Sequence, residues 1–330
     1  MLPEEDLDRL ASEGFLPTGV NADDHVVSLA RLARSGFHEV WYDDTAAKAD
    51  GQSRQVPFRA FTEQFADRRD NEQLRLIGHT SRCGSTLLAN LLALRPATMV
   101  LNEPDFVTIP VRRIALAAGG AEAQTFGSLL RALLNFTCHA AAAAGRVSVI
   151  KLTSWTVPVV VASLGRREDT SWLFLWADPG KMVASNVAKH PSWGKDTENG
   201  RAAARLTGID GIMPGTVKFY ANIWCRIVDS FQPADGKLRS RTLGYQDLSR
   251  DKAAALLAAE KWFDLTSDTG LPADFEQEST RYSKGSPAEK FEPVKSHLRS
   301  PLDQHEIREV GAITKRSLDA LRGEKSHRLL

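Results

Sequence analysis

From residue 74 onward, short apolar runs alternate along the chain with longer amphipathic segments. The short runs predict strands at residues 74–78, 98–101, 147–152, 171–176 and 237–243. The segments between them predict helices at about residues 85–94, 111–118, 124–143, 155–164, 180–189, 215–231 and 250–263. Strands that alternate with helices in this way are joined by right-handed crossovers and form a parallel sheet. The pattern therefore predicts an α/β fold, with a central parallel β-sheet flanked by helices.

The first 70 residues show a different pattern, in which short apolar segments are interrupted by polar breaks. Within residues 28–44 the pattern predicts a helix that ends at Gly36, followed by an aromatic patch of Phe37, Trp41 and Tyr42. Residues 57–67 predict a second helix. We therefore expect residues 1–70 to be a helical N-terminal extension packed on a core of residues 71–330. The aromatic patch fits ordinary packing, and it also fits the wall of an acceptor pocket.

A long loop is expected at residues 190–213, which are rich in glycine and polar residues and lie between two predicted helices. Loops of this length are often lids or acceptor loops. A plain surface connection fits the same composition equally well.

The stretch LRLIGHTSRCGST at residues 74–86 predicts a strand, a tight polar loop and the start of a helix. Such a turn gathers backbone N–H donors at a helix N-terminus, where an anion is favoured. It departs from a Walker A loop, because five residues separate Gly78 from Gly84 and Ser85 stands where that pattern has its lysine. Arg82 is the only cation of the loop. A Gly/Ser helix cap without a ligand is the alternative interpretation.

Polar residues follow three of the predicted strands, and the carboxyl ends of parallel strands meet at one edge of a sheet. We expect these residues to lie near the loop: Asn102, Glu103 and Pro104; Lys151, Thr153 and Ser154; Asp178, Ser185 and Asn186. A carboxylate, a lysine and several hydroxyls beside an anion site are suited to group transfer.

Composition narrows the function further. The 330 residues include 42 Lys and Arg against 41 Asp and Glu, for a net charge of +1, so no overall charge favours nucleic acid or an acidic membrane. The three cysteines, Cys83, Cys138 and Cys225, lie far apart, which argues against disulfides and a zinc knuckle. No leader and no run of 18 apolar residues is found, so we expect a cytoplasmic protein without membrane insertion.

With these residues in place, the chain resembles the P-loop sulfotransferases that use 3'-phosphoadenosine 5'-phosphosulfate (PAPS). The strongest match is SRCGSTLL at residues 81–88, which is similar to the 5'-phosphosulfate loop of that family. The segment WLFLWADPGKMVASN at residues 172–186 is similar to its 3'-phosphate segment. Supporting matches are NEP at 102–104, VIKLT at 149–153, GYQDL at 244–248 and SKG at 283–285. The resemblance implies a P-loop NTPase-like, three-layer fold for residues 71–330.

The resemblance also implies roles for individual residues. Arg82 would contact the 5'-phosphosulfate and offset charge on the bridging oxygen, while Gly84, Ser85 and Thr86, with Cys83 between them and Arg82, would cradle the 5'-phosphate. The 3'-phosphate would be bound by a second group of residues, Ser185, Lys284 and Gly285. No metal is needed, because the transferred group carries less charge than a phosphoryl group. A thiol at Cys83 beside so many positive groups would have a depressed pKa, although a tolerated small residue is the simpler account.

Two positions depart from the family pattern. Ala177 stands where the family has an Arg that grips the 3'-phosphate, so Arg281, Lys284 or Lys181 would have to substitute. Thr153 stands where many small-molecule members have a His that takes the acceptor proton.

A different base is therefore needed. Glu103 occupies a place similar to the catalytic glutamate of several carbohydrate sulfotransferases, and a carboxylate beside an anion site suits proton abstraction. The alternative for Glu103 is a cap on the following loop or an ion pair with Arg112 or Arg113, and His190 is the second candidate base. Lys151 would steady the transferring group.

The resulting hypothesis is a PAPS-dependent sulfotransferase that acts on a hydroxyl or amine of a small-molecule or carbohydrate acceptor. A P-loop kinase or nucleotide hydrolase of related fold is the first alternative, which the missing lysine at Ser85 disfavours. A catalytically inactive binding protein is the second, because the Arg at Ala177 and the His at Thr153 are absent. The sequence leaves the identity of the acceptor open.

Overall fold

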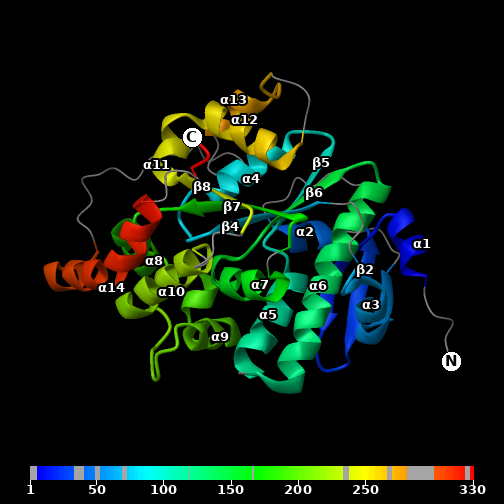
Figure 1. Cartoon of the computed structure of the whole chain (residues 1–330), viewed down its shortest axis with the longest axis horizontal. Helices are drawn as coiled ribbons and strands as arrows, with labels where there is room; N and C mark the ends of the chain where they lie inside the picture. Colours follow the sequence, from blue (N-terminus) through cyan, green and yellow to red (C-terminus); the bar gives the residue numbers. More distant parts are fainter. Residues whose placement is uncertain are drawn as a thin grey trace.

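Two β-sheets form the framework of the chain (Figure 1). The computed structural model describes residues 6–32, 41–48, 53–68, 73–117, 119–165, 167–232, 238–265, 270–280, 301–323 and 328–330. One sheet is five-stranded and parallel, and the other is three-stranded and antiparallel.

The parallel sheet confirms the predicted α/β class. Its strands are β4 (Leu74–His79), β5 (Thr98–Asn102), β6 (Val147–Lys151), β7 (Thr170–Trp176) and β8 (Ser240–Gly244), in the order β5-β6-β4-β7-β8. All five overlap the predicted apolar runs, whose residues are largely buried, as parallel strands between helices require. In β4, for example, Leu76 and Ile77 are fully buried. Residue 237, where the last run is predicted to begin, lies outside the described residues.

Helices cover both faces of this sheet. They are α4 (Ser85–Ala93), α5 (Asp105–Ala117), α6 (Gly120–Ala143), α7 (Val157–Leu164), α8 (Pro179–Ala188), α10 (Val217–Ser230), α11 (Tyr245–Arg250), α12 (Lys252–Phe263), α13 (Phe275–Thr280) and α14 (Gln304–Gly323). In Figure 1, α4 and α12 lie above the sheet, whereas α7 and α10 lie below it, and α14 packs on α8 and α10. The predicted helices of residues 74–263 are therefore confirmed, although α5 starts before the predicted residue 111 and holds Pro110 in its interior.

The N-terminal region differs from the helical extension that the sequence predicts. Its strands β1 (Phe15–Asn21), β2 (Val26–Arg31) and β3 (Ser53–Pro57) form an antiparallel sheet, with the short helices α1 (Leu7–Ser12), α2 (Tyr42–Ala47) and α3 (Phe58–Phe65) beside it. The expectation of a helix from residue 28 is wrong as far as Arg31, and residues 33–40 lie outside the described residues. The second predicted helix, at 57–67, is confirmed as α3.

The error at β2 has a physical cause. Leu29 and Leu32 are spaced as on a helix face. In the structure, Val27 and Leu29 are fully buried on one face of the strand, and Ser28 between them is half-buried. Because β2 pairs with β1 on one side and β3 on the other, strand pairing over long range outweighs local helix propensity. This sheet packs against α5 and α6, at the right of Figure 1.

The expected loop at residues 190–213 also contains regular structure. A short 3₁₀ helix at Ser192–Gly194 is followed by α9 (Glu198–Leu206). The hydroxyl of Thr197 caps α9 by accepting a hydrogen bond from the N–H of Gly200 at 3.2 Å. Gly200 in the first turn lowers the helix propensity of this segment, so the sequence pattern does not predict the helix. The Thr197 cap and the three alanines at 202–204 are the signals in the sequence that favour it.

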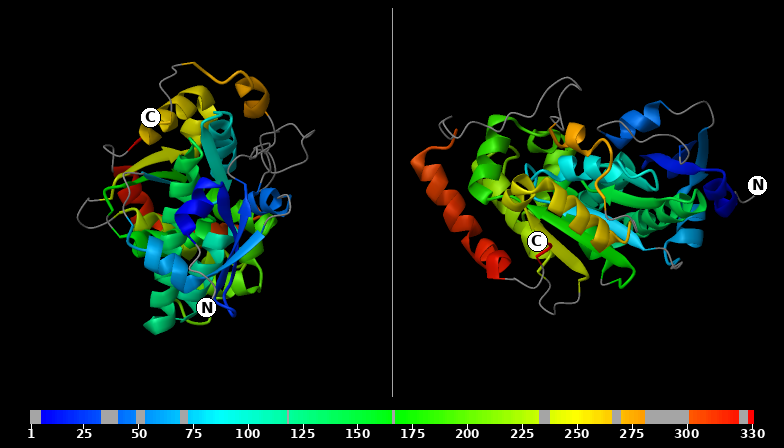
Figure 2. Two further views of the ribbon diagram at one scale, coloured as in Figure 1. Left: turned by 90° about the vertical axis from the view of Figure 1, so that its right-hand side faces the viewer. Right: turned by 90° about the horizontal axis from the view of Figure 1, so that it is seen from above.

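The order of the strands places the functional site. Strand β4 is central, with β5 and β6 on one side and β7 and β8 on the other. Ligands of open parallel sheets bind beyond the carboxyl ends of the strands, where the chain switches from one side to the other. That position is the end of β4, from which the loop at residues 80–84 leads into α4 (Figure 2).

Replacing Gly78 by alanine should destabilise the fold. A Cβ at Gly78 would lie 2.7 Å from Cζ of Phe231, a ring that stacks on Phe174 with 4.2 Å between centroids. We expect Gly78→Ala to lower the free energy of unfolding by about 1 to 3 kcal/mol, as overpacking of a core does, measured by urea denaturation.

Gly127→Ala is the matched control for that substitution. Gly127 lies inside α6, and a Cβ there would meet no atom closer than Nη1 of Arg131 at 4.0 Å. We expect a gain of about 0.5 to 1 kcal/mol from helix propensity. Equal effects of the two substitutions would contradict the proposed contact with Phe231.

Candidate active site

The loop between β4 and α4 has an unusual backbone. Ser81, Arg82 and Gly84 have φ values of 69°, 50° and 78°, in the left-handed region that non-glycine residues rarely adopt. Gly84 is the N-cap of α4, and a Cβ there would lie 2.7 Å from Cδ2 of Leu248 on α11. Glycine is therefore required at position 84 both by the backbone and by the close approach of α11.

Donor groups gather at this turn. Within the described part of the chain, the backbone N–H groups of residues 82–87 donate to no backbone carbonyl, and that of Ser85 faces the sulfur of Cys83. The hydroxyl of Thr86 is buried, and it has no partner among the described residues. Buried donors are normally paired, and N–H groups at a helix N-terminus bind oxyanions. The loop therefore fits a phosphate or sulfate group.

Helix α8 holds the cation of the loop. Nε of Arg82 donates to Oδ1 of Asn186 at 3.1 Å, and Nη2 donates to the carbonyl of Lys189 at 2.8 Å. Oγ of Ser81 donates to the same Oδ1 at 3.4 Å. Asn186 is fully buried, and the side chain of Asp178 caps α8. The sequence points to Asn186 only as a neighbour of Ser185, and the structure shows that it orients Arg82.

A buried ion pair lies at the ends of the two neighbouring strands. Lys151, the last residue of β6, is fully buried, and its Nζ donates to Oε1 of Glu103, which follows β5. The N–H of Glu103 donates to the carbonyl of Lys151 at 2.7 Å, and Glu103 has a left-handed φ of 51°. A buried ammonium needs an anion beside it, and the backbone of Glu103 is held in a strained form that provides one.

This pair settles the alternative partner of Glu103. The ion pair with Arg112 or Arg113 that the sequence allows does not form. Arg112 instead pairs with Glu198 of α9 at 3.2 Å, and Arg113 pairs with Glu122 of α6 at 2.9 Å.

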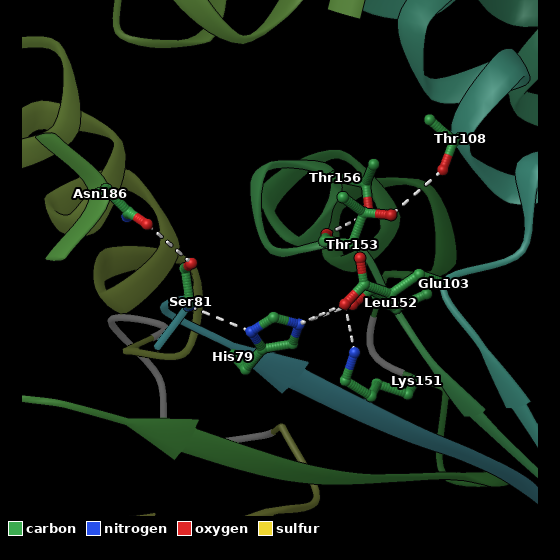
Figure 3. Close-up of polar contacts among 9 residues, drawn as sticks. All are labelled: His79, Ser81, Glu103, Thr108, Lys151, Leu152, Thr153, Thr156 and Asn186. Atoms are coloured by element: carbon green, nitrogen blue, oxygen red, sulfur yellow. Dashed lines mark hydrogen bonds and ion pairs between the residues drawn. The ribbon is translucent and has the colours of Figure 1, made fainter. Parts of the chain in front are cut away.

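His79 connects the loop with the ion pair (Figure 3). It is the last residue of β4 and is almost completely buried. Its ring accepts the N–H of Ser81 at Nδ1, at 3.0 Å, and contacts the carbonyl of Leu152 through Nε2, at 2.8 Å. Nε2 also lies 3.8 Å from Oε1 of Glu103. The sequence assigns His79 no role, and nothing in its spacing marks it.

Burial decides the state of Cys83. The thiol is 1% exposed, and desolvation raises its pKa above the ordinary value, although hydrogen bonds and the charge of Lys151 act in the opposite direction. The expectation of a depressed pKa is therefore wrong. Cys83 acts as the small buried residue that the sequence allows as the simpler account.

Residues expected at the 3'-phosphate are only partly described. Ser185 is exposed on α8, and the exposed Lys181 precedes it by four residues, on the same face of the helix. Ala177 is buried, and its carbonyl accepts from Nε1 of Trp224 at 3.1 Å. The other residues expected there lie outside the described residues: Arg281, Lys284 and Gly285.

The second candidate base lies beside the cation of the loop. Nδ1 of His190 is 2.9 Å from the hydroxyl of Tyr220. Burial raises the pKa of Tyr220 to about 12, so this hydroxyl keeps its proton at neutral pH.

Thr153, which stands where the sequence comparison expects a His, contacts Thr108 with 3.3 Å between the two hydroxyl oxygens.

The N-terminal region also reaches the site through α2. The ring of Trp41 has its centroid 5.8 Å from Nζ of Lys151. Tyr42 is a core residue, with its hydroxyl on the carbonyl of Pro17 at 2.6 Å and its ring against Phe106. The aromatic patch is therefore divided between packing and the site, and Phe37 lies outside the described residues.

Asp43, two residues after Trp41, has a carboxyl group with a strongly raised pKa. The N–H of Asp105 donates to its Oδ1 at 3.3 Å. Burial, and then the charge of Asp105, raise the pKa of Asp43 from 3.8 to about 7, and burial also raises the pKa of Asp105. The sequence gives no sign of this, because residues 43 and 105 are brought together only by the fold.

The described residues contain no group of three or more His, Cys, Asp or Glu side chains placed to hold a metal ion. No helix among them has the length and hydropathy to cross a membrane.

Comparisons with known proteins give a limited result. No protein-family model matches the chain, and no curated protein matches it. A sulfotransferase domain from the curacin biosynthetic pathway is similar in structure, with a TM-score of 0.43 and 12% identity over 74% of this chain and 98% of that one. Sulfotransferase STF9 from Mycobacterium avium has a TM-score of 0.47 and 13% identity over 96% of each chain. Likenesses of this size do not establish a family.

Asp43→Asn should change how stability depends on pH. A folded-state pKa of about 7 means that the folded protein binds the proton more tightly than the unfolded chain, so stability falls as pH rises from about 4 to about 7. Asparagine keeps the acceptor for the N–H of Asp105 and removes this loss. Relative to the unchanged protein, we expect the variant to gain about 1 to 2 kcal/mol between pH 4 and pH 8, allowing for solvent screening of a partly exposed group.

Urea unfolding at both pH values measures this difference. Asp210→Asn, on the exposed turn after α9, removes one negative charge elsewhere and serves as the control. A pH dependence that is the same in Asp43→Asn and in the unchanged protein would show that Asp43 titrates normally.

Proposed function

We propose that the protein transfers a sulfuryl group from PAPS to a hydroxyl or amine acceptor. The observation that carries this proposal is the loop at residues 80–86. From residue 82 on, its backbone N–H groups donate to no backbone carbonyl of the described chain; they and the hydroxyl of Thr86 fit an oxyanion, and its one cation, Arg82, is held beside them by Asn186. Ser85 occupies the place of the Walker lysine, which a triphosphate would require and a 5'-phosphosulfate does not.

The proposed reaction is an in-line displacement at sulfur. The acceptor oxygen or nitrogen forms a bond to sulfur while the bond from sulfur to the 5'-phosphate oxygen breaks, and adenosine 3',5'-bisphosphate leaves with the electron pair. Arg82 and the N–H groups of the loop stabilise the charge that develops on that oxygen. Because these groups are oriented before the donor binds, little reorganisation is needed in the transition state.

Glu103 is the proposed base of this reaction. Its carboxylate is held by Lys151 at the ends of the strands, where it would accept a proton from the acceptor. When the proton arrives, Glu103 becomes neutral and the ammonium of Lys151 loses its counter-ion. The same event therefore directs the positive charge of Lys151 toward the sulfuryl oxygens, which supports both roles proposed for this pair.

The two ends of the donor are supported to different degrees. At the 5' end, loop, helix N-terminus and Arg82 converge. At the 3' end, Ala177 supplies no charge, and Lys181 with Ser185 on one face of α8 are the proposed substitutes. The acceptor is proposed to bind near Trp41, whose ring lies beside Lys151.

Calorimetric titration tests the donor. We expect adenosine 3',5'-bisphosphate to bind with a dissociation constant in the micromolar range and more tightly than 5'-AMP or ATP with magnesium. Arg82→Ala should weaken binding of the bisphosphate about 10- to 100-fold, because a hydrogen-bonded charge pair is lost.

Arg59→Ala is the matched control, since Arg59 is on α3 with its side chain 86% exposed and pairs with Glu63 on the same helix. Tighter binding of ATP with magnesium would favour a kinase or hydrolase. Absence of binding by all three nucleotides would favour an inactive binding protein.

Glu103→Gln tests the base. We expect bisphosphate affinity to be kept while turnover falls about 100- to 10,000-fold, the usual contribution of a general base. Turnover is measured as bisphosphate released from PAPS in the presence of a panel of phenol, sugar and amine acceptors.

The variant leaves the buried Lys151 without an anion, so thermal unfolding must be measured alongside. The double variant with Lys151→Met removes that unpaired charge and should be equally inactive. Full turnover of a folded Glu103→Gln protein would show that another group, such as His190, is the base.

A further inference from the structure

His79 lies between the two parts of the site that the proposed reaction must keep in register. Its ring contacts the loop on one edge and the strand ends on the other (Figure 3), and 3% of the residue is exposed. Histidine at the end of a central strand is a costly choice for a core position, because both ring nitrogens require partners.

The hydrogen bonds of the ring define its protonation. Nδ1 faces the backbone N–H of Ser81 at 3.0 Å, and an N–H can only donate, so Nδ1 must be the unprotonated acceptor. Nε2 faces the carbonyl of Leu152 at 2.8 Å, and a carbonyl can only accept, so Nε2 must carry the proton. The ring is therefore a neutral imidazole with its proton on Nε2.

The Nδ1 contact acts on the cation of the loop. Ser81 and Arg82 are consecutive residues with left-handed φ, a conformation that persists only when the surroundings hold it. The ring fixes the N–H of Ser81, and Asn186 fixes the side chains of both residues. Loss of the ring would leave the backbone of Ser81 without its anchor and would allow Arg82 to move.

The Nε2 contact acts on the ion pair. Leu152 directly follows Lys151, so its carbonyl marks the end of β6. Nε2 lies 3.8 Å from Oε1 of Glu103, the atom that also binds Nζ of Lys151. The ring thus sets the distance between the loop at residues 80–86, which we call the anion loop, and the carboxylate of Glu103 across the end of β4.

We propose that His79 is a positioning residue, whose neutral Nε2–H ring holds the anion loop in register with the Glu103–Lys151 pair. The identity of the anion rests on the proposed function, whereas the role of the ring in holding the loop does not. The proposed role needs no contact of His79 with the transferred group or the acceptor.

Two substitutions separate the two edges of the ring. His79→Asn places an amide oxygen near the position of Nδ1 and keeps an acceptor for Ser81. His79→Gln places an amide nitrogen near the position of Nε2, keeps a donor for Leu152 and leaves the N–H of Ser81 without a partner. In calorimetric titration with adenosine 3',5'-bisphosphate, we expect His79→Gln to bind at least about 10-fold more weakly and His79→Asn to stay within about 3-fold of the unchanged protein. Equal affinities of the two variants would overturn the proposed role in holding the loop.

Nuclear magnetic resonance tests the ring without any ligand. In the unchanged protein labelled with ¹⁵N-histidine, the ring signals of His79 are identified as those that are missing from the spectrum of His79→Asn. These signals should show an unprotonated Nδ1 and a protonated Nε2 at neutral pH. The amide of Ser81 should exchange with solvent faster in His79→Gln than in His79→Asn. A ring protonated at Nδ1, or a Ser81 amide that exchanges equally in both variants, would overturn the proposal. If the unchanged protein binds no bisphosphate, the proposed function fails, and these two measurements still decide the role of His79.

Discussion

A lysine that is fully buried at the end of a strand is the constraint on which the site depends. The ammonium of Lys151 cannot remain charged in the interior without an anion, and Glu103 supplies it from the end of the neighbouring strand. The backbone conformation serves the same pairing, because Glu103 adopts a left-handed φ while its N–H donates to the carbonyl of Lys151. Strain in the chain is thus offset by an ion pair, as is common where a side chain must be aimed precisely.

The anion loop obeys a different constraint. The backbone N–H groups of residues 82–87 donate to no backbone carbonyl of the described chain, so their desolvation is costly unless a ligand or solvent pairs with them. The fold keeps these groups in place through packing: α11 closes on Gly84, α8 holds Arg82, and His79 holds Ser81. A site that is oriented before its ligand binds loses less entropy on binding.

How much of this can be predicted follows from the range of each interaction. The strand before the loop, the turn at Gly84 and the helix after it depend on neighbouring residues, and the sequence predicts all three. The pairing of Lys151 with Glu103 joins residues 48 positions apart, so the sequence offers Glu103 two arginine partners as readily as the lysine that it binds. His79 shows the same limit, because a histidine after a strand has no spacing that would mark its partners.

The sequence by itself determined the parallel α/β core, since buried runs and helical spacing are local patterns, and it determined that the loop lacks a Walker lysine. Only the tertiary structure decided that residues 15–57 hold an antiparallel sheet, that α2 brings Trp41 to Lys151, and that Cys83 is a buried thiol with a raised pKa. The physical reason is that strand pairing, desolvation and ion pairing depend on which distant segments meet. Periodicity along the chain does not predict which distant segments come into contact.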